Sequence, residues 1–352
     1  MLLSPDLFAI NNNKTTNHTK ENVKKEKFNP GEMIFGHILD SYEWHIATIG
    51  KMHISVPTII ILYYNNKLDV FLSGKFHHGH KSYKGYKIEQ QGKNKGKIVR
   101  VIDDGITTDK SASLPIDLSI TKNVMSIFIS FILLCFIFIS VAKSYTKNKK
   151  KSPKGLQSLL EPVILFVRDD IAKTCIGKKK YERYMPFLLT VFFFILLNNL
   201  LGIIPIFPGG ANVTGNISVT LVLAVFTLII TSVTGNKRYW KDIFNSSSVP
   251  WWLKIPMPLV PIIEIMGMFT KPFALMMRLF ANMLSGHIII LSIIGLIFIF
   301  GEFNIGLGYG VSVISVLFVV FMDFLELLVA FIQAYVFTLL SAVYFGMATE
   351  ED

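Results

Sequence analysis

An arginine lies inside one of the most apolar parts of this 352-residue chain. Arg278 is the only lysine or arginine after Lys271, and mostly apolar sequence extends around it from Met257 to Phe300. Placing a guanidinium at the centre of a membrane helix costs from roughly 2.5–3.5 to about 10–17 kcal/mol, depending on the method. Because arginine keeps its proton at all ordinary pH values, Arg278 would act as a fixed positive charge and not as a proton carrier. We therefore expect it to face something other than lipid.

Further polar and ionisable residues accompany Arg278 in the last two apolar segments: Glu264, Asn282, Ser285 and His287 in the first, and Asp323, Glu326 and Gln333 in the second. Ionisable residues inside a membrane usually mark an ion path. A helix turns by about 100° per residue, which places Arg278, Asn282 and Ser285 on one face. His287 then points to nearly the opposite side. We predict that Glu326 and His287 face each other across a helical hairpin and share a proton.

Each of these residues also has a purely structural alternative. Arg278 could extend to a membrane surface, and Glu326 with His287 could only lock two helices together. The amides of Asn282 and Gln333 are of a kind that commonly joins membrane helices. Glu264 lies near one end of its segment and could simply be interfacial.

The chain as a whole has the composition of an integral membrane protein. Its residues are 51% hydrophobic, and the apolar ones are gathered in long windows instead of being periodic. A membrane helix needs about 20 such residues. The windows therefore predict an all-α membrane fold with about five membrane helices, near Leu118–Ala142, Pro186–Pro205, Ile217–Thr234, Pro258–Phe300 and Gly308–Phe345. The last two would each be on the order of 60 Å long. We expect them to form a long, tilted C-terminal helical hairpin with its turn at Gly301–Gly308.

The net charge of +11 is explained by topology and does not require nucleic acid as a partner. Lysines concentrate beside the spans, in Lys143–Lys154, Lys173–Arg183 and Lys237–Lys241. The positive-inside rule places these segments in the cytoplasm. Five spans then leave the N-terminus outside and the acidic tail Thr349–Asp352 inside. The two cysteines, Cys135 and Cys175, imply no disulfide framework.

Residues 1–116 differ from the rest, being polar and lysine-rich without a membrane window. Val56–Tyr64 and Leu68–Ser73, joined by Asn65 and Asn66, have the pattern of a β-hairpin, and Tyr86–Gln90 and Ile98–Ile102 could add strands. We predict a small, β-rich extracytoplasmic extension, disordered over about its first 25 residues, followed by a membrane domain at 117–352. No apolar signal-like segment precedes residue 116, so a removed signal peptide is our hypothesis for export. The tract His77–His80 lacks acidic or cysteine partners, and we expect a solvated loop, not a metal site.

The segment Leu156–Ile176 has apolar residues at helical spacing, with Arg168, Asp169 and Asp170 on the other side. This pattern predicts an amphipathic helix on the cytoplasmic membrane surface. A soluble helix packed on a partner is the alternative.

Motifs of soluble catalysis are missing from the sequence. It contains no phosphate-binding Walker loop, no nucleophile elbow and no zinc-spaced cluster. We therefore expect neither an enzyme nor a cofactor. The polar residues in the apolar segments could also belong to a secondary transporter or an ion-channel subunit. Transporters usually show repeated halves, however, and this sequence shows none. A structural membrane anchor is a third possibility.

The run from Lys271 to His287 (KPFALMMRLFANMLSGH) closely resembles the signature of subunit a of the rotary F-type ATP synthase. The resemblance continues in Tyr184–Pro205, Asn212–Thr220 and Glu326–Asp352, and covers roughly residues 155–352. It says little about residues 1–116, although a long N-terminal extension resembles that of some Gram-negative lineages.

The resemblance implies a proton-conducting stator subunit of the F0 sector, with two offset half-channels that lead to a ring of c subunits. Arg278 matches the family's essential arginine, and the other matching proton-path positions are Asn282, His287, Glu326, Gln333, Glu264, Asn199 and Asn216. The implied partners are the c-ring, the subunit b stalk, the rest of the F1F0 complex and membrane lipid. The implied location is the bacterial inner membrane, with the N-terminal region periplasmic and the C-terminus cytoplasmic. Gly202 stands where some members have an acid, and Ala274 where some have a serine.

Overall fold

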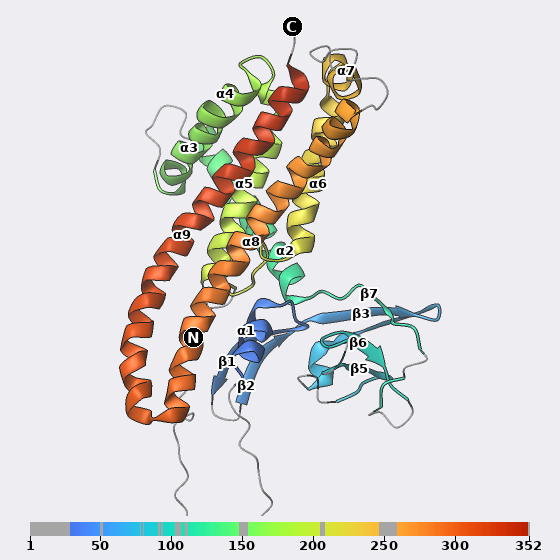
Figure 1. Ribbon diagram of the computed structural model, residues 1–352, viewed down its shortest axis with the longest axis vertical. Helices are drawn as coiled ribbons and strands as arrows, with labels where there is room; N and C mark the ends of the chain where they lie inside the picture. Colours follow the sequence, from blue (N-terminus) through green and yellow to red (C-terminus); the bar gives the residue numbers. More distant parts are fainter. Residues whose placement is uncertain are drawn as a thin grey trace, which may run out of the picture. The chain divides into compact units, whose positions relative to one another are not determined.

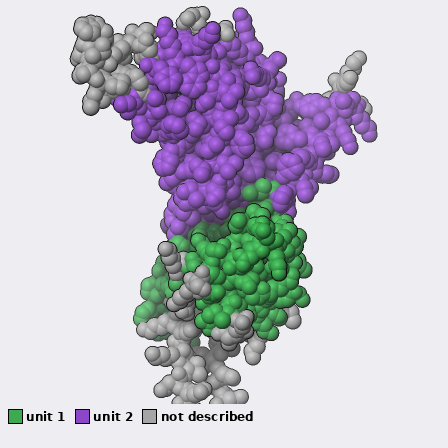
Figure 2. All heavy atoms as spheres, turned by 90° about the vertical axis from the view of Figure 1, so that its right-hand side faces the viewer, with its two compact units in different colours: residues 1–127, 204–211, 295–311 green, residues 128–203, 212–294, 312–352 purple. Residues whose placement is uncertain are grey.

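The computed structural model describes residues 29–49, 52–77, 79, 81–90, 92, 94–102, 107–109, 112–147, 154–204, 208–245 and 259–350. The chain divides into two compact units (Figure 2). Unit 1 comprises Met1–Ile127, Ile204–Ala211 and Gly295–Val311, and unit 2 comprises Phe128–Ile203, Asn212–Ile294 and Ser312–Asp352. We describe each by itself.

Unit 1 contains the strand-rich N-terminal region. Its elements are α1 (Pro30–Ile38), β1 (Glu43–Ile49), β2 (Met52–Pro57), β3 (Ile59–Tyr64), β4 (Lys67–Leu72), η2 (Ser73–Phe76), β5 (Tyr86–Ile88), β6 (Ile98–Arg100) and β7 (Ile116–Asp117). The strands form three antiparallel sheets, β1–β2, β4–β3–β7 and β5–β6 (Figure 1). The predicted β-rich region is therefore present.

The β3–β4 hairpin confirms the turn prediction. Asn65 and Asn66 both have positive φ, 45° and 59°, as a two-residue hairpin turn of the primed type requires. The predicted start of the first strand at Val56 is wrong, because Val56 belongs to β2 and pairs with Trp44. Thr58 separates β2 from β3, and its backbone N–H donates to Ser73 Oγ at 2.9 Å.

Other N-terminal predictions have mixed outcomes. The predicted strands Tyr86–Gln90 and Ile98–Ile102 exist as the shorter pair β5 and β6. The prediction of disorder over the first 25 residues lies outside the described part of the chain. Of the histidine tract only His77 and Gly79 are described, and the described residues contain no group of three metal-ligating side chains.

Helices make up the rest of the chain: α2 (Lys122–Lys147), α3 (Leu156–Phe166), the π-helical η3 (Val167–Ala172), α4 (Lys173–Ile176), α5 (Tyr181–Ile203), α6 (Ile217–Thr234), α7 (Lys237–Asn245), α8 (Leu259–Phe303) and α9 (Ile305–Thr349). Five of those in the described ranges, α2, α5, α6, α8 and α9, are long and apolar enough to cross a membrane. This confirms the predicted helical membrane architecture.

The turn between α8 and α9 is shorter than predicted. Each helix has 45 residues, and Asn304 is the one residue between them. Its Oδ1 accepts a hydrogen bond from Gly306 N–H at 2.8 Å. A Cβ on Gly308 would lie 2.9 Å from Gly301 Cα. These glycines therefore permit close helix approach instead of ending the helices, which is why the Gly301–Gly308 turn prediction is wrong in length.

The predicted amphipathic segment is helical throughout, as α3, η3 and α4. Its buried residues Val167, Ile171 and Ile176 pack into the core of unit 2 with α5 and α9. A Cβ on Gly346 of α9 would lie 2.1 Å from Cys175 O. Part of the apolar stripe is therefore covered by the protein itself, while Leu156 and Leu159 remain exposed.

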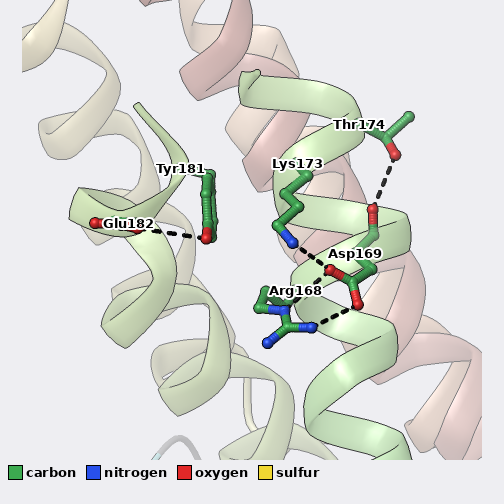
Figure 3. Close-up of polar contacts among 6 residues, drawn as sticks. All are labelled: Arg168, Asp169, Lys173, Thr174, Tyr181 and Glu182. Atoms are coloured by element: carbon green, nitrogen blue, oxygen red, sulfur yellow. Dashed lines mark hydrogen bonds and ion pairs between the residues drawn. The ribbon is translucent and has the colours of Figure 1, made fainter. Parts of the chain in front are cut away.

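The polar side of this segment carries a compact ion-pair cluster (Figure 3). Arg168 donates from Nε and Nη2 to the two oxygens of Asp169 at 2.9 and 2.8 Å, and Lys173 Nζ lies 2.6 Å from Asp169 Oδ1. The Arg168 guanidinium, followed by Lys173, holds the pKa of Asp169 well below its usual range. The carboxylate therefore stays ionised at neutral pH.

Candidate functional site

The two sides of α8 differ in the way that the helical spacing predicts. Leu275, Met276, Leu279 and Met283 are buried, each at 3% exposure or less. Arg278, Asn282 and Ser285 are all exposed. Within the described residues, Arg278 forms neither a hydrogen bond nor an ion pair. Its charge is therefore directed away from the protein's own core.

His287 points to the other side and meets α9. Its Nδ1 lies 2.5 Å from Glu326 Oε1. The Glu326 residue is only 6% exposed. The predicted contact across the hairpin is confirmed, and it joins the two groups in a short hydrogen bond able to carry one proton between them.

Gly286 makes room for this pair, and the sequence reasoning overlooked it. A Cβ at this position would lie 2.8 Å from Glu326 Oε1. The available signal in the sequence was a glycine directly before His287 and about one helical turn after Met283. Here glycine is required because a carboxylate approaches the helix closely.

Glu264, Arg278 and His287 are spread along α8, which also carries Lys271 and Glu302. Arg278 lies 14 positions after Glu264 and 9 positions before His287. At about 1.5 Å per residue, these separations are about 21 and 13 Å. Glu264 is exposed. The pKa of Tyr239 on α7 is raised, mainly by the burial of Tyr239 and also by the negative charge of Glu264. Glu264 and the His287–Glu326 pair thus occupy separate places on either side of Arg278.

The predicted stripe on α9 is present but uneven in its surroundings. Glu326 and Gln333 are buried, Gln333 at 5% exposure, while Asp323 is half-buried. The three residues are spaced by three and seven positions and share one side of the helix. Gln333 is thus placed on the protein-facing side of α9.

Two predicted proton-path residues have structural contacts. Asn199 is fully buried; its Nδ2 donates to Ala330 O at 3.2 Å, and its Oδ1 accepts from Thr214 Oγ1 at 2.6 Å. Asn216 caps α6 by accepting from Ser218 N–H at 2.9 Å. The structure does not bring either one to Arg278 by a direct bond, and their roles in proton movement stay predictions.

Two further asparagines near these positions were not among the candidates. Asn198 Oδ1 and Asn212 Nδ2 are buried and have no hydrogen-bond partner. Buried amide groups without partners are rare and call for water or a bound group. Asn198 directly precedes the predicted Asn199, so the pair Asn198–Asn199 was the available signal, whereas Asn212 lies four positions before the predicted Asn216.

One end of unit 2 gathers basic residues around the last turn of α9. A cavity of about 480 Å³ is lined there by Lys179, Lys180, Glu182, Arg183, Tyr184, Thr234, Asn236 and Thr349. Lys180 Nζ donates to Thr349 O at 2.7 Å, and Asn236 N–H donates to Ala348 O at 2.8 Å. The predicted basic segments at Lys173–Arg183 and Lys237–Lys241 therefore share an end with the C-terminal turn (Figure 1).

Comparison with known proteins gives matches over both parts of the chain. A family model described as ATP synthase A chain matches residues 124–346. A second, described as a domain of unknown function (DUF8433), matches residues 33–118.

Curated relatives match about two thirds of the chain. The chain is 43% identical over 243 residues to ATP synthase subunit a of Chloroherpeton thalassium, with 67% of this chain and 68% of that protein covered. It is 47% identical over 239 residues to ATP synthase subunit a 2 of Chlorobaculum tepidum, covering 66% and 64%. It is 44% identical over 240 residues to ATP synthase subunit a of Myxococcus xanthus, covering 66% and 74%. The chain therefore belongs to the ATP synthase A chain family.

Proposed function

We propose that this chain is the stator subunit through which protons cross the F0 membrane sector of a rotary ATP synthase. Its relatives carry the name ATP synthase subunit a, and the family model covers well over half of its length. The chain is then a proton-translocating component and not itself an enzyme, because ATP chemistry belongs to other subunits of such a complex.

The observation that carries the mechanism is the exposed Arg278 on a mostly apolar helix. A fixed positive charge that has no ion-pair partner among the described residues is unfavourable in lipid, so we assign it a partner outside the chain. We assign that partner to a ring of c subunits, each with a carboxylate. The carboxylate is neutral while it faces lipid and ionises when it comes opposite Arg278, because the nearby positive charge favours the charged form.

Two half-channels would bring protons to and from this point. We assign His287 and Glu326 to the outer half-channel and Glu264 to the cytoplasmic one, with Asn282, Gln333, Asn199 and Asn216 as accompanying polar positions. The separation of Glu264 from the His287–Glu326 pair along α8, with Arg278 between them, supports two offset paths. Arg278 would keep the paths apart, so that a proton crosses only by riding the rotor. Each charge that falls through 100 mV supplies about 2.3 kcal/mol.

The same proposal implies an orientation of the chain in the membrane and a set of partner subunits. The basic segments that meet the last turn of α9 support a cytoplasmic C-terminus. Residues 1–116 would then form a periplasmic extension, and 117–352 the membrane domain in the bacterial inner membrane. The lengths of α8 and α9, about 68 Å each at 1.5 Å per residue, support a steep tilt in the bilayer. The c-ring, the subunit b stalk and the rest of the F1F0 complex would be its partners.

Arg278→Ala tests the proposal in inverted membrane vesicles that carry the assembled complex. ATP-driven proton pumping should be abolished, while the complex still assembles in the same sample. Arg238→Ala on α7 is the matched control, since Arg238 is also exposed but lies outside the candidate spans. Full pumping by the Arg278 variant would overturn the coupling role and favour a transporter or an anchor. Labelling of a cysteine at position 326 only from the cytoplasm would overturn the half-channel assignment.

A further inference from the structure

One face of the three-stranded sheet β4–β3–β7 is apolar and is left uncovered by the part of the chain that the structure describes. Residues paired across neighbouring strands lie on the same face, and the pairs are Ile59 with Leu72, Ile61 with Val70, and Tyr63 with Leu68 and Ile116. Leu118 continues this face beside Ile61. Seven of the eight are exposed, by 40 to 61%: Ile59, Tyr63, Leu68, Val70, Leu72, Ile116 and Leu118.

The opposite face of the same sheet is covered. Ile60, Leu62 and Phe71 are buried there with Phe76, Tyr86 and Ile98, and Figure 1 shows β5 and β6 on that side. Strand β3 therefore carries apolar residues on both faces, as strands that are covered on both sides do. Within the described residues only one of its two faces is covered by protein.

Hydrogen bonds join the sheet directly to the residues that lead into a candidate membrane span. Leu118 N–H donates to Ile61 O and Ile120 N–H donates to Ile59 O, both at 2.9 Å. Ser119 Oγ accepts from Ile61 N–H at 3.1 Å. Helix α2 then begins at Lys122, whose N–H donates to Ser41 O at 2.9 Å. Once α2 crosses the bilayer, the sheet has to lie at the membrane surface.

We propose that this apolar face, from Ile59 to Leu118, lies on the bilayer and inserts its side chains into the interfacial region of the leaflet where α2 begins. Exposed apolar patches of more than a few hundred Å² are rare on soluble proteins and mark binding surfaces. Lipid is the occupant because the bilayer already surrounds helix α2, which begins at Lys122, five positions after β7 ends at Asp117. Tyr63 suits the position, since an amphipathic ring is favoured at the headgroup level. The N-terminal region is then a membrane-lying sheet and not a domain that projects into solvent. This inference does not depend on proton transport.

Neighbouring residues on β4 provide a test with a matched control. Leu68 and Lys67 are both exposed and lie on opposite faces of the sheet. Both are at the hairpin end of β4, whereas Ile120 lies beside the other end, at the Ile59–Leu72 pair. Leu68→Cys and Lys67→Cys are made in the full chain with Cys135 and Cys175 replaced by serine, and each is labelled with bimane. The assembled complex is placed in phosphatidylcholine vesicles that contain lipid spin-labelled near the top of its acyl chain.

Fluorescence quenching by the spin-labelled lipid should be several-fold stronger for the Leu68 probe than for the Lys67 probe. Weak quenching of both, with both cysteines open to a water-soluble maleimide, would overturn the proposal, because the sheet would then project into water. Protection of Leu68→Cys from maleimide without quenching would also overturn it, because protein would then cover the face. Equal, strong quenching of the two probes would contradict the one-sided arrangement. Both sites are exposed, so the substitutions leave the core intact.

Discussion

The contact between His287 and Glu326 depends on Gly286, a residue with no side chain. The carboxylate reaches the imidazole because Gly286 leaves space for Oε1 beside the helix. Glu326 is nearly buried, so hydrogen bonding is what makes its charged or shared-proton state tolerable there. Position 286 is thus a positioning residue for the predicted proton path.

Gly286→Ala should displace Glu326 and lengthen or break its bond to His287, because the new Cβ would fall 2.8 Å from Oε1. We expect proton pumping to fall several-fold while the complex still assembles. Gly267→Ala is the control, since α8 offers nothing within 4 Å of a Cβ there, and alanine is the better helix former by roughly 0.8–1 kcal/mol. Equal pumping rates for the two variants, measured in inverted vesicles, would refute the positioning role.

At the scale of elements, the segment α3–η3–α4 packs on other helices with one side and carries ion pairs within itself on the other. Its apolar side packs on α5 and α9, and the backbones of α4 and α9 approach closely at Cys175 and Gly346. Its polar side carries Asp169 between Arg168 and Lys173 (Figure 3). Because this carboxylate is well exposed, its ion pairs are screened by salt and contribute modestly.

Asp169→Asn should lower thermal stability slightly at neutral pH and not at all in acid. The folded-state pKa of Asp169 is depressed by Arg168 and Lys173, and the unfolded value is about 3.9. The contribution is therefore present above the unfolded pKa and is lost as the pH falls through the folded pKa. Melting temperatures of the two purified proteins at a series of pH values, in low salt, check this. A difference that grows on acidification would contradict the assigned sign.

At the scale of the whole molecule, the sequence predicted what periodicity and charge determine. Five apolar windows specified five candidate spans, and Asn65–Asn66 specified the β3–β4 turn because both positions need positive φ. The contact of His287 with Glu326 followed from helical geometry. The spans and the turn depend on local spacing alone, and the helical hairpin then brings His287 opposite Glu326.

What the sequence did not reveal depends on contacts between distant segments. The hairpin β1–β2 was missed, although a glycine, Gly50, directly follows Ile49 in the sequence. The Gly301–Gly308 turn was predicted too long, because glycine marks a close helix approach as readily as a break. Asn199 was predicted as a proton-path position, and its hydrogen bonds to Thr214 and Ala330 were not foreseen. Only the fold determines whether a buried amide meets protein or water.

The C-terminal turn of α9 accepts hydrogen bonds from Lys180 and Asn236, which lie directly before α5 and α7, and its removal should affect the whole of unit 2. A chain that stops after Met347 lacks the carbonyls to which Asn236 and Lys180 donate. Since each lost hydrogen bond contributes about 0.5–1.5 kcal/mol, we expect a lower melting temperature and less assembled complex. A chain that stops after Glu350 keeps both acceptors and is the control. Indistinguishable melting temperatures for the two truncated chains would show that these bonds contribute nothing.

These two bonds also have a consequence for the order in which the protein is made. Asn236 and Lys180 leave the ribosome long before Ala348 and Thr349, which come more than a hundred residues later in the chain. Helices α5 and α6 can therefore enter the membrane before the donors that flank them have acceptors on α9. The helical unit completes this end only after the last turn of α9 has been made, so a nascent chain that has not reached Ala348 would remain distinguishable from one that has passed it.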